Sequence, residues 1–286
     1  MKKIKNILWC SILLALSACG GGSPAESLPH AVLSVDSNII TTNLSTQIVR
    51  GISCDLINTD ISPAVKFWLF QLNNRQPYHC LQVNKADGHP THLGDYSYRF
   101  ELRPDDCTWS NSWNDCTNDR SRTEIEDDHN NAYGKEIIWD YWMYIPEQNN
   151  FKPAGTAFLS VSQVLAMSAN NYFGLTQLLI SKENKLVIRP LQQYSFITEG
   201  DIPVVDNPFN KWINIRYEVK ASATDEGYLR VIINGKLILE KYGANVLDKD
   251  LRVMLRLGIY NSSKSRATEP YNTQIMYFDT INKIVK

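Results

Sequence analysis

The sequence predicts an all-β fold, either a sandwich or a barrel. After about the first thirty residues, the chain is a series of short apolar or alternating runs separated by clusters of Gly, Asn, Asp and Pro, with little helical periodicity. Asn234-Gly235 lies between two alternating runs and indicates a β-hairpin, because a type I′ turn needs positive φ at both central residues. In residues 137–145, rings and apolar side chains alternate onto both faces, which predicts a strand with contacts on both sides.

The predicted strands follow one another along the chain. They are 66–72, 97–102, 136–145, 157–166, 175–180, 185–190, 211–220, 228–233, 236–240, 252–260 and 273–281. No internal repeat or linker separates them, so we expect residues 31–286 to form a single β-sandwich domain.

A leader precedes this domain. Lys2, Lys3 and Lys5 are followed by an apolar run and then by small residues, which is typical of a secretory signal peptide over residues 1–18. The apolar run is shorter than the roughly 20 residues that cross a bilayer, and no later segment has a comparable run. We therefore expect an exported chain that is not held by a transmembrane helix.

Cys19 ends a segment, Leu-Ser-Ala-Cys at residues 16–19, that resembles the lipobox of bacterial lipoproteins. The resemblance implies that Cys19 carries lipid and is the first mature residue; an ordinary signal peptide with a Cys near its cleavage site is the alternative. Residues 19–30 then form the lipidated Cys and a flexible Gly/Ser tether, and the membrane is contacted through lipid only. The uncharged Gly20 favours the outer membrane of a bacterial cell envelope, on its periplasmic or surface side.

The composition excludes one class of partner. The net charge is −1, so the chain lacks the basic excess expected of a nucleic-acid-binding protein. The seven Trp and 14 Tyr supply rings that can fill a core or stack on sugars.

Four cysteines remain after Cys10 of the leader and Cys19 are set aside. In an oxidising compartment four cysteines can pair in three ways. Cys107 with Cys116 closes a short loop rich in Ser, Asn and Asp, which leaves Cys54 to pair with Cys80. A metal site is the alternative, although the sequence has no C-x-x-C or His-rich spacing that would favour it.

The densest polar stretch includes residues 120–126. If these residues form a strand, Arg120, Arg122, Glu124 and Glu126 share one face and are about 6.8 Å apart at each step of two. Two guanidinium groups beside two carboxylates could bind a sugar acid, or they could form a structural ladder of ion pairs.

Several blocks of sequence suggest a family. They are residues 99–103 (Arg-Phe-Glu-Leu-Arg), 113–116 (Trp-Asn-Asp-Cys), 120–124 (Arg-Ser-Arg-Thr-Glu) and 139–146 (Trp-Asp-Tyr-Trp-Met-Tyr-Ile-Pro), with 227–235 and 257–260 as closing blocks. In their order and spacing they resemble polysaccharide lyases of the heparin-lyase and glucuronan-lyase type. The resemblance implies a concanavalin-like jelly-roll sandwich, a concave sheet that forms a cleft for an acidic polysaccharide, and β-elimination beside a 4-linked uronic acid without a required cofactor.

The resemblance also implies roles for individual residues. Arg122 and Gln163 would hold the substrate carboxylate, and Tyr260 would donate the proton and could also act as the base. Glu124 would hold Arg122 in place, and both Arg120 and Glu124 would contribute to substrate binding. Packing within the sandwich is the alternative for Tyr260. Gln163 lies on an otherwise apolar strand, and a buried amide is costly unless it is paired.

One position departs from the family pattern. Related lyases often carry a His two residues after that Gln, and this chain has Leu165 there. The base would then be Tyr260 or another His; His129 is five residues past Glu124, and His79, His89 and His92 are further candidates, each of which could equally be a surface or core His.

Several further aromatic and acidic residues have alternative roles. Trp142 and Tyr144 could stack on sugar rings or fill the core, and Asp105, Asp106 and Asp115 could supply oxygens to a structural calcium. A glycoside hydrolase of the same architecture would use two of Glu124, Glu126 and Asp128. A carbohydrate-binding lipoprotein without catalysis is the third hypothesis, after the lyase and the hydrolase.

Overall fold

The computed structural model describes the greater part of the chain beyond residue 38. The described residues are 39–44, 47–54, 67–69, 73–111, 113–147, 151, 158–168, 171–191, 200–247, 251–262, 265 and 272–286. They fall within one compact unit, Asp36–Lys286. Cys19, the predicted signal peptide and the tether lie outside the described residues. None of the helical residues in these ranges belongs to a helix long and apolar enough to cross a membrane.

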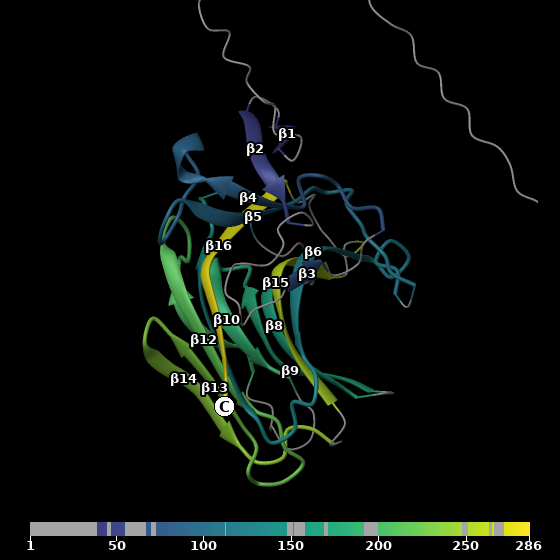
Figure 1. Ribbon diagram of the computed structural model, residues 1–286, viewed down its shortest axis with the longest axis vertical. Coiled ribbons are helices and arrows are strands. Elements are labelled where there is room, and N and C mark those ends of the chain that lie inside the picture. The colour runs from purple at the N-terminus through teal and green to yellow at the C-terminus, as the bar shows by residue number, and fades with distance from the viewer. Residues whose placement is uncertain are drawn as a thin grey trace, which may run out of the picture. The chain divides into compact units, whose positions relative to one another are not determined.

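Two antiparallel sheets face one another (Figure 1). Within the described ranges, the nine-stranded sheet has, in spatial order, β1 (Ile39–Leu44), β2 (Gln47–Ser53), β4 (Cys80–Asn84), β5 (Tyr96–Leu102), β16 (Gln274–Val285), β7 (Glu136–Tyr144), β12 (Trp212–Lys220), β13 (Tyr228–Ile233) and β14 (Lys236–Tyr242). The seven-stranded sheet, counted over the same ranges, has β11 (Ile202–Asp206), β10 (Lys185–Pro190), β9 (Asn171–Ile180), β8 (Leu159–Ser168), β15 (Leu251–Ser262), β6 (Arg120–His129) and β3 (Phe67–Leu69). The predicted all-β jelly-roll sandwich is confirmed.

Most predicted strands are present with small changes at their ends. The hairpin between β13 and β14 turns at Asn234 and Gly235, whose φ angles are 48° and 76°, as a type I′ turn requires. The polar stretch 120–126 is part of β6. Strands β1, β2, β4 and β11 were not predicted, because they are short or are interrupted by residues such as Gly51 and Pro203.

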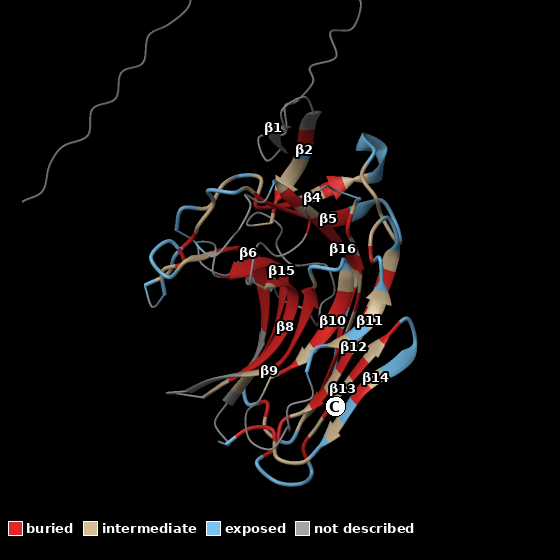
Figure 2. Cartoon of the chain, turned by 180° about the vertical axis from the view of Figure 1, so that it is seen from behind, coloured by how far each residue is buried: buried red, intermediate tan, exposed pale blue. Residues whose placement is uncertain are grey.

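The core lies between the two sheets and follows the two-residue alternation of the strands. Trp139, Tyr141 and Met143 of β7 are fully buried and face residues such as Leu255 and Leu257 of β15. Figure 2 shows the buried residues concentrated along β8, β15 and β6 in the seven-stranded sheet and along β16 in the other.

A buried ion pair also connects the sheets. The Asp127 carboxylate on β6 is 2.8 Å from the Lys283 ammonium on β16, and it accepts a 2.6 Å hydrogen bond from the Trp139 indole on β7. All three side chains are buried. Because each polar group has a partner, the charges are tolerated inside the sandwich.

Both predicted disulfides are confirmed. Cys54 is bonded to Cys80, and Cys107 is bonded to Cys116. The second bridge closes the loop that carries Trp113 and Asp115 toward the seven-stranded sheet.

The buried ion pair gives a test of the fold. Lys283→Met leaves the Asp127 carboxylate buried without its cation, so the free energy of unfolding should fall by about 3–5 kcal/mol. Lys286→Met, one residue beyond the end of β16, is the matched control, because Lys286 pairs with Glu136 at an exposed position and its loss should cost less than about 1 kcal/mol. Urea denaturation measures both changes, and equal losses in the two variants would contradict this account.

Candidate active site

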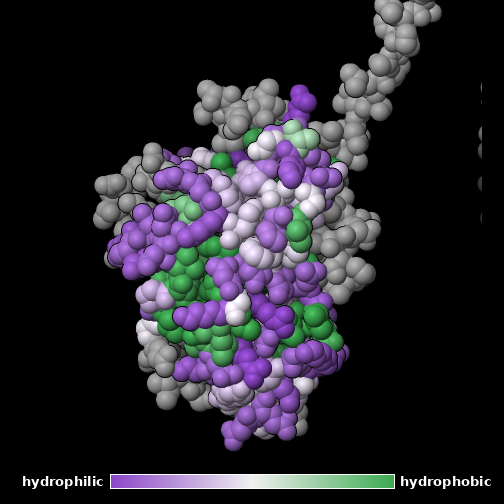
Figure 3. Space-filling view, turned by 90° about the vertical axis from the view of Figure 1, so that its left-hand side faces the viewer, coloured by the Kyte–Doolittle hydropathy of each residue, from purple (hydrophilic) through white to green (hydrophobic). Residues whose placement is uncertain are grey.

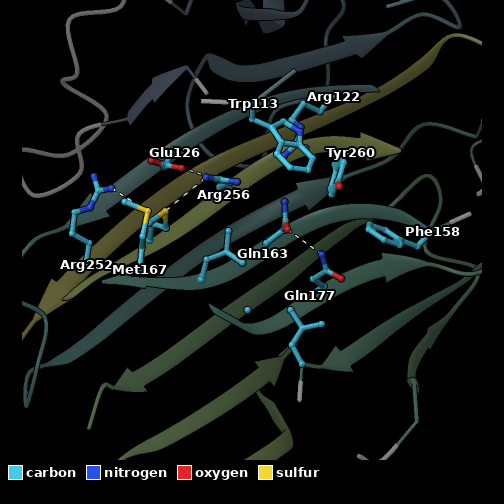
Figure 4. A pocket seen from close by; sticks show the side chains of 14 residues that line it. Trp113, Arg122, Glu126, Phe158, Gln163, Met167, Gln177, Arg252, Arg256 and Tyr260 are labelled. Atoms are coloured by element: carbon cyan, nitrogen blue, oxygen red, sulfur yellow. Dashed lines mark hydrogen bonds and ion pairs between the residues drawn. The ribbon is translucent and has the colours of Figure 1, made fainter. Parts of the chain in front are cut away.

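A cavity of about 610 Å³ lies on the outer face of the seven-stranded sheet. Its lining includes polar side chains from β6, β8, β9 and β15, namely Arg122, Glu126, Gln163, Gln177, Arg256 and Tyr260 (Figure 4). They share this face because Ile125 on β6 and Leu257 on β15 point into the core, and the alternate residues of each strand must point the other way.

Arg122 is held by two carboxylates. Its Nε and Nη2 atoms donate to the two oxygens of Asp115 at 2.6 and 2.8 Å, and its Nη1 donates to Glu124 at 3.3 Å. Burial alone would lower the pKa of the Arg122 guanidinium, but the charge of Glu124 and the bonds to Asp115 outweigh it and raise the pKa above its usual value. Arg122 therefore remains positively charged in a site where only 5% of its surface is exposed.

A chain of hydrogen bonds fixes the two glutamines. The Gln163 amide nitrogen donates to Glu124 at 2.6 Å, and the Gln163 amide oxygen accepts from Gln177 at 3.0 Å. Both amides are buried, so each polar contact offsets the cost of desolvation. Glu124 thus orients Arg122 and Gln163 together.

Tyr260 lies directly against the Arg122 guanidinium. The Arg122 Cζ is 3.9 Å from the centroid of the Tyr260 ring, and Phe158 packs edge-on against the same ring at 5.3 Å. Two residues earlier, Gly258 has φ 146°, and a Cβ at this position would collide with the backbone of Thr123 and Glu124. Glycine therefore lets β15 approach β6 closely where the pairing with β8 shifts between Leu257 and Tyr260.

The disulfide-closed loop brings Trp113 to the cavity and Asp115 to the Arg122 guanidinium. The Trp113 indole donates to the Asp115 carboxylate at 2.8 Å, so this carboxylate joins the indole at the cavity rim to the Arg122 guanidinium. Trp113 is 44% exposed and lines the cavity. An exposed ring beside a charged polar cluster can stack on a sugar ring.

The structure places the predicted site residues in two groups. Arg122, Gln163 and Tyr260 lie around the same cavity, and Glu124 lies behind Arg122 and Gln163. Arg120 is at the start of β6, where its Nη1 donates to the backbone oxygen of Asp119, and it does not line the cavity.

Trp142 and Tyr144 are on the outer face of the nine-stranded sheet, away from the cavity. Trp142 stacks on His92 with ring centroids 3.8 Å apart, and Tyr144 packs against Trp212 at 5.4 Å. Both are partly exposed, so neither fills the core between the sheets. Figure 3 views the molecule from the side of this sheet and shows mainly hydrophilic surface with separate hydrophobic patches.

No described histidine side chain lines the cavity, whereas Leu165 does. His79 is buried, and its Nε2 atom is 3.2 Å from the Asp106 carboxylate. His92 stacks on Trp142 on the outer face of the nine-stranded sheet. His89 is within 3.2 Å of the Tyr277 hydroxyl; burial, together with the charge of Arg99, lowers its pKa. His129 is at the end of β6, and its side chain lies outside the described part of the structure.

The aspartates considered as calcium ligands have other partners. Asp115 binds Arg122, and Asp106 accepts hydrogen bonds from the Tyr78 hydroxyl and the Arg103 backbone. Asp105 is exposed. Among the described side chains, no group of three or more His, Cys, Asp or Glu is placed to hold a metal ion.

Several residues that line the cavity or hold Arg122 in place were not predicted from the sequence. Gln177 could have been found by the signal that identified Gln163, an amide on an apolar strand. Asp115 was considered only as a calcium ligand, and its contact with Arg122 depends on the fold of the disulfide loop. Arg256 pairs with Glu126 across two strands at 2.6 Å, a contact that sequence spacing does not reveal.

Comparison with known proteins identifies the family. The family model described as "Polysaccharide lyase" matches residues 57–282. Among solved structures, alginate lyase Aly36B has a TM-score of 0.52 at 11% identity, with 87% of this chain and 96% of that chain covered. The endo-β-1,4-glucuronan lyase from the fungus Trichoderma reesei has a TM-score of 0.49 at 15% identity, with 77% and 90% covered. No curated protein sequence matches the chain. The family match extends over most of the sandwich and includes the strands that carry Arg122, Gln163 and Tyr260, and the chain belongs to the polysaccharide lyase family.

Proposed function

We propose that this lyase cleaves a polysaccharide that contains uronic acid by β-elimination, with Arg122, Gln163 and Tyr260 as the reacting site. The observation that supports it is the meeting of a guanidinium, an amide and a phenol around one cavity. A uronate needs these groups, because the proton on C5 becomes acidic enough to remove only when the adjacent carboxylate is neutralised.

In the proposed reaction a single residue, Tyr260, accepts the proton, and the bonding electrons move within the sugar. Tyr260 reacts as the phenolate: its oxygen takes the C5 proton and becomes a phenol, and the electrons of the C5–H bond form the C4–C5 double bond as the C4–O bond breaks. The proton then passes to the leaving oxygen. Arg122 and Gln163 stabilise the charge that builds up on the carboxylate, and they are already fixed by Glu124, so little reorganisation is needed during the reaction.

The stereochemistry of the substrate follows from the use of a single phenol. Glu124 and Glu126 are each bound to an arginine, and Leu165 offers no proton-transfer group. If Tyr260 both removes and delivers the proton, C5–H and C4–O must lie on the same face of the sugar. Glucuronate and mannuronate have this arrangement, whereas guluronate, iduronate and galacturonate do not.

The family match favours this activity over the hydrolase considered from the sequence. Glu124 and Glu126 are also unsuited to hydrolysis by their contacts, since each carboxylate already compensates a buried guanidinium. A glycosidase needs one protonated and one ionised carboxyl group beside the bond that it cleaves.

We also propose the cellular setting from the sequence. Residues 1–18 would be removed as a signal peptide, Cys19 would carry lipid, and residues 19–30 would tether the lyase domain, residues 31–286, to the bacterial outer membrane. The domain would then meet acidic polymers or their fragments in the periplasm or at the cell surface.

The activity is tested with defined polymers. Full-length protein in detergent should release products with the ultraviolet absorbance of an unsaturated uronate from polyglucuronate and polymannuronate. It should release none from polyguluronate or polygalacturonate. New reducing ends without this absorbance would indicate hydrolysis and overturn the proposal, and equal cleavage of all four polymers would contradict the single-phenol mechanism.

Two variants separate binding from proton transfer. Tyr260→Phe should lower kcat by at least about 100-fold and leave KM within a few-fold, because only the proton-transfer hydroxyl is removed. Arg122→Lys should raise KM and lower kcat, because it loses the fork that binds carboxylates. Arg216→Lys, on the outer face of the other sheet, is the matched control and should leave both constants unchanged. Full activity in Tyr260→Phe would exclude the assigned role.

The anchor is tested by labelling. A clickable fatty acid fed to the expressing bacterium should label the wild-type protein and Cys10→Ser, and it should not label Cys19→Ser. The unlabelled variant should move from the membrane fraction to the soluble fraction. Label that persists in Cys19→Ser would refute the proposed anchor.

A further inference from the structure

The cavity has a second, apolar half beyond the reacting site. After Gln163, the next residues of β8 that face the cavity are Leu165 and Met167. Met254 of β15 is the cross-strand partner of Leu165. The outer face of an antiparallel sheet is usually polar when it faces water. Apolar side chains that line a cavity on such a face indicate a ligand with an apolar part.

Gly174, which has no side chain, leaves room for a further apolar residue in this half of the cavity. Gly174 of β9 is the partner of Leu165 on its other side, and Leu191 packs over the space that a Cβ of Gly174 would occupy. A larger residue at position 174 would displace Leu191 from the cavity. Leu191 therefore adds a further apolar side chain beside Leu165.

Two arginines lie next to the apolar residues. Arg252 is the cross-strand partner of Met167, and its Nη2 is 3.3 Å from the Met167 sulfur (Figure 4). Arg256 is 3.9 Å from the Met254 sulfur and is paired with Glu126. A ligand in this half would thus meet guanidinium groups together with apolar surface.

We propose that the apolar half binds a methyl-terminated substituent of the acidic polymer, either an O-acetyl ester or the C6 methyl of a 6-deoxy sugar. This inference rests on the proposed function, since it places the substituent next to the uronate that is cleaved. Leu165 follows Gln163 by two residues on one strand face, a separation of about 6.8 Å. The substituent is therefore on the cleaved uronate or on a neighbouring sugar.

The physical reason is the different cost of burying hydroxyl and methyl groups. An unsubstituted hydroxyl against Leu165, Met167 and Met254 would lose hydrogen bonds to water without gaining a partner. A methyl group at the same place gains from burial, and each one is worth about a fourfold change in binding.

The experiment compares matched polymers. Full-length protein is given O-acetylated polyglucuronate or polymannuronate and the same preparation after mild alkaline deacetylation. A third polymer alternates the same uronate with a 6-deoxy sugar, and its control replaces that sugar with the corresponding 6-hydroxy sugar. We expect kcat/KM to be at least about fourfold higher for the methyl-bearing member of one pair; the pair that shows the effect identifies the source of the methyl group.

Variants locate the effect. Met167→Gln and Leu165→Asn replace apolar groups by amides of similar size, and they should reduce the ratio between the two members of the pair to about one. Leu237→Gln makes a comparable change at an exposed position on the nine-stranded sheet and should keep the wild-type ratio. Equal kcat/KM for both members of both pairs in the wild-type protein, or a wild-type ratio in both cavity variants, would overturn the inference.

The inference about the apolar half can still be tested if the proposed elimination is not observed. If no polymer yields an unsaturated uronate, calorimetric titration with acetylated and deacetylated oligouronates, and with the 6-deoxy and 6-hydroxy oligosaccharides, still decides the inference. At least about fourfold tighter binding of the methyl-bearing member of either pair, lost in Met167→Gln, supports the inference even though the proposed elimination has failed. Equal binding within both pairs overturns it.

Discussion

The two-residue period of the strands in the seven-stranded sheet is the constraint on which the cavity depends. Ile125, Leu255 and Leu257 must point between the sheets, because their burial holds the sandwich together. Their neighbours along β6 and β15 are then forced onto the opposite face, where Arg122 and Tyr260 meet. A shift of register by one residue would exchange the two sets, so the packing of the core also specifies the side chains of the site.

Charge compensation is the second requirement, because the polar groups of the cavity are nearly all buried. Arg122 is balanced by Asp115 and Glu124, and Arg256 is balanced by Glu126. Removing one partner from such a pair leaves an uncompensated charge, which costs far more than the pair itself contributes. The same contacts fix the donors in position before substrate arrives, which is the condition for strong electrostatic stabilisation of a developing negative charge.

Alternation in the sequence predicted most strands, the β13–β14 hairpin and the presence of rings on both faces of β7. It did not reveal β2 or β11, where Gly51 and Pro203 interrupt the pattern. Periodicity states which side of its own strand a residue occupies, but it does not state which sheet the strand joins. Arg122, Gln163 and Tyr260 thus share a cavity, whereas Trp142, from an equally aromatic strand, lies on the other sheet. The contact of Asp115 with Arg122 was not predicted, because a loop closed by a disulfide has no periodicity.

Leu165 connects the mechanism with the choice of substrate. Position 165 is the next position after Gln163 on the face of β8 that lines the cavity. Any side chain at position 165 is therefore next to Gln163, which is proposed to hold the substrate carboxylate. An imidazole at this place would supply a second proton-transfer group and would break the apolar surface formed with Met254. Leucine has the opposite effect on both counts: in the proposed mechanism it leaves proton transfer to Tyr260, and it lines the apolar half of the cavity together with Met167 and Met254. Restriction to one configuration of uronate and preference for a methyl-bearing polymer would then have a common origin in one residue.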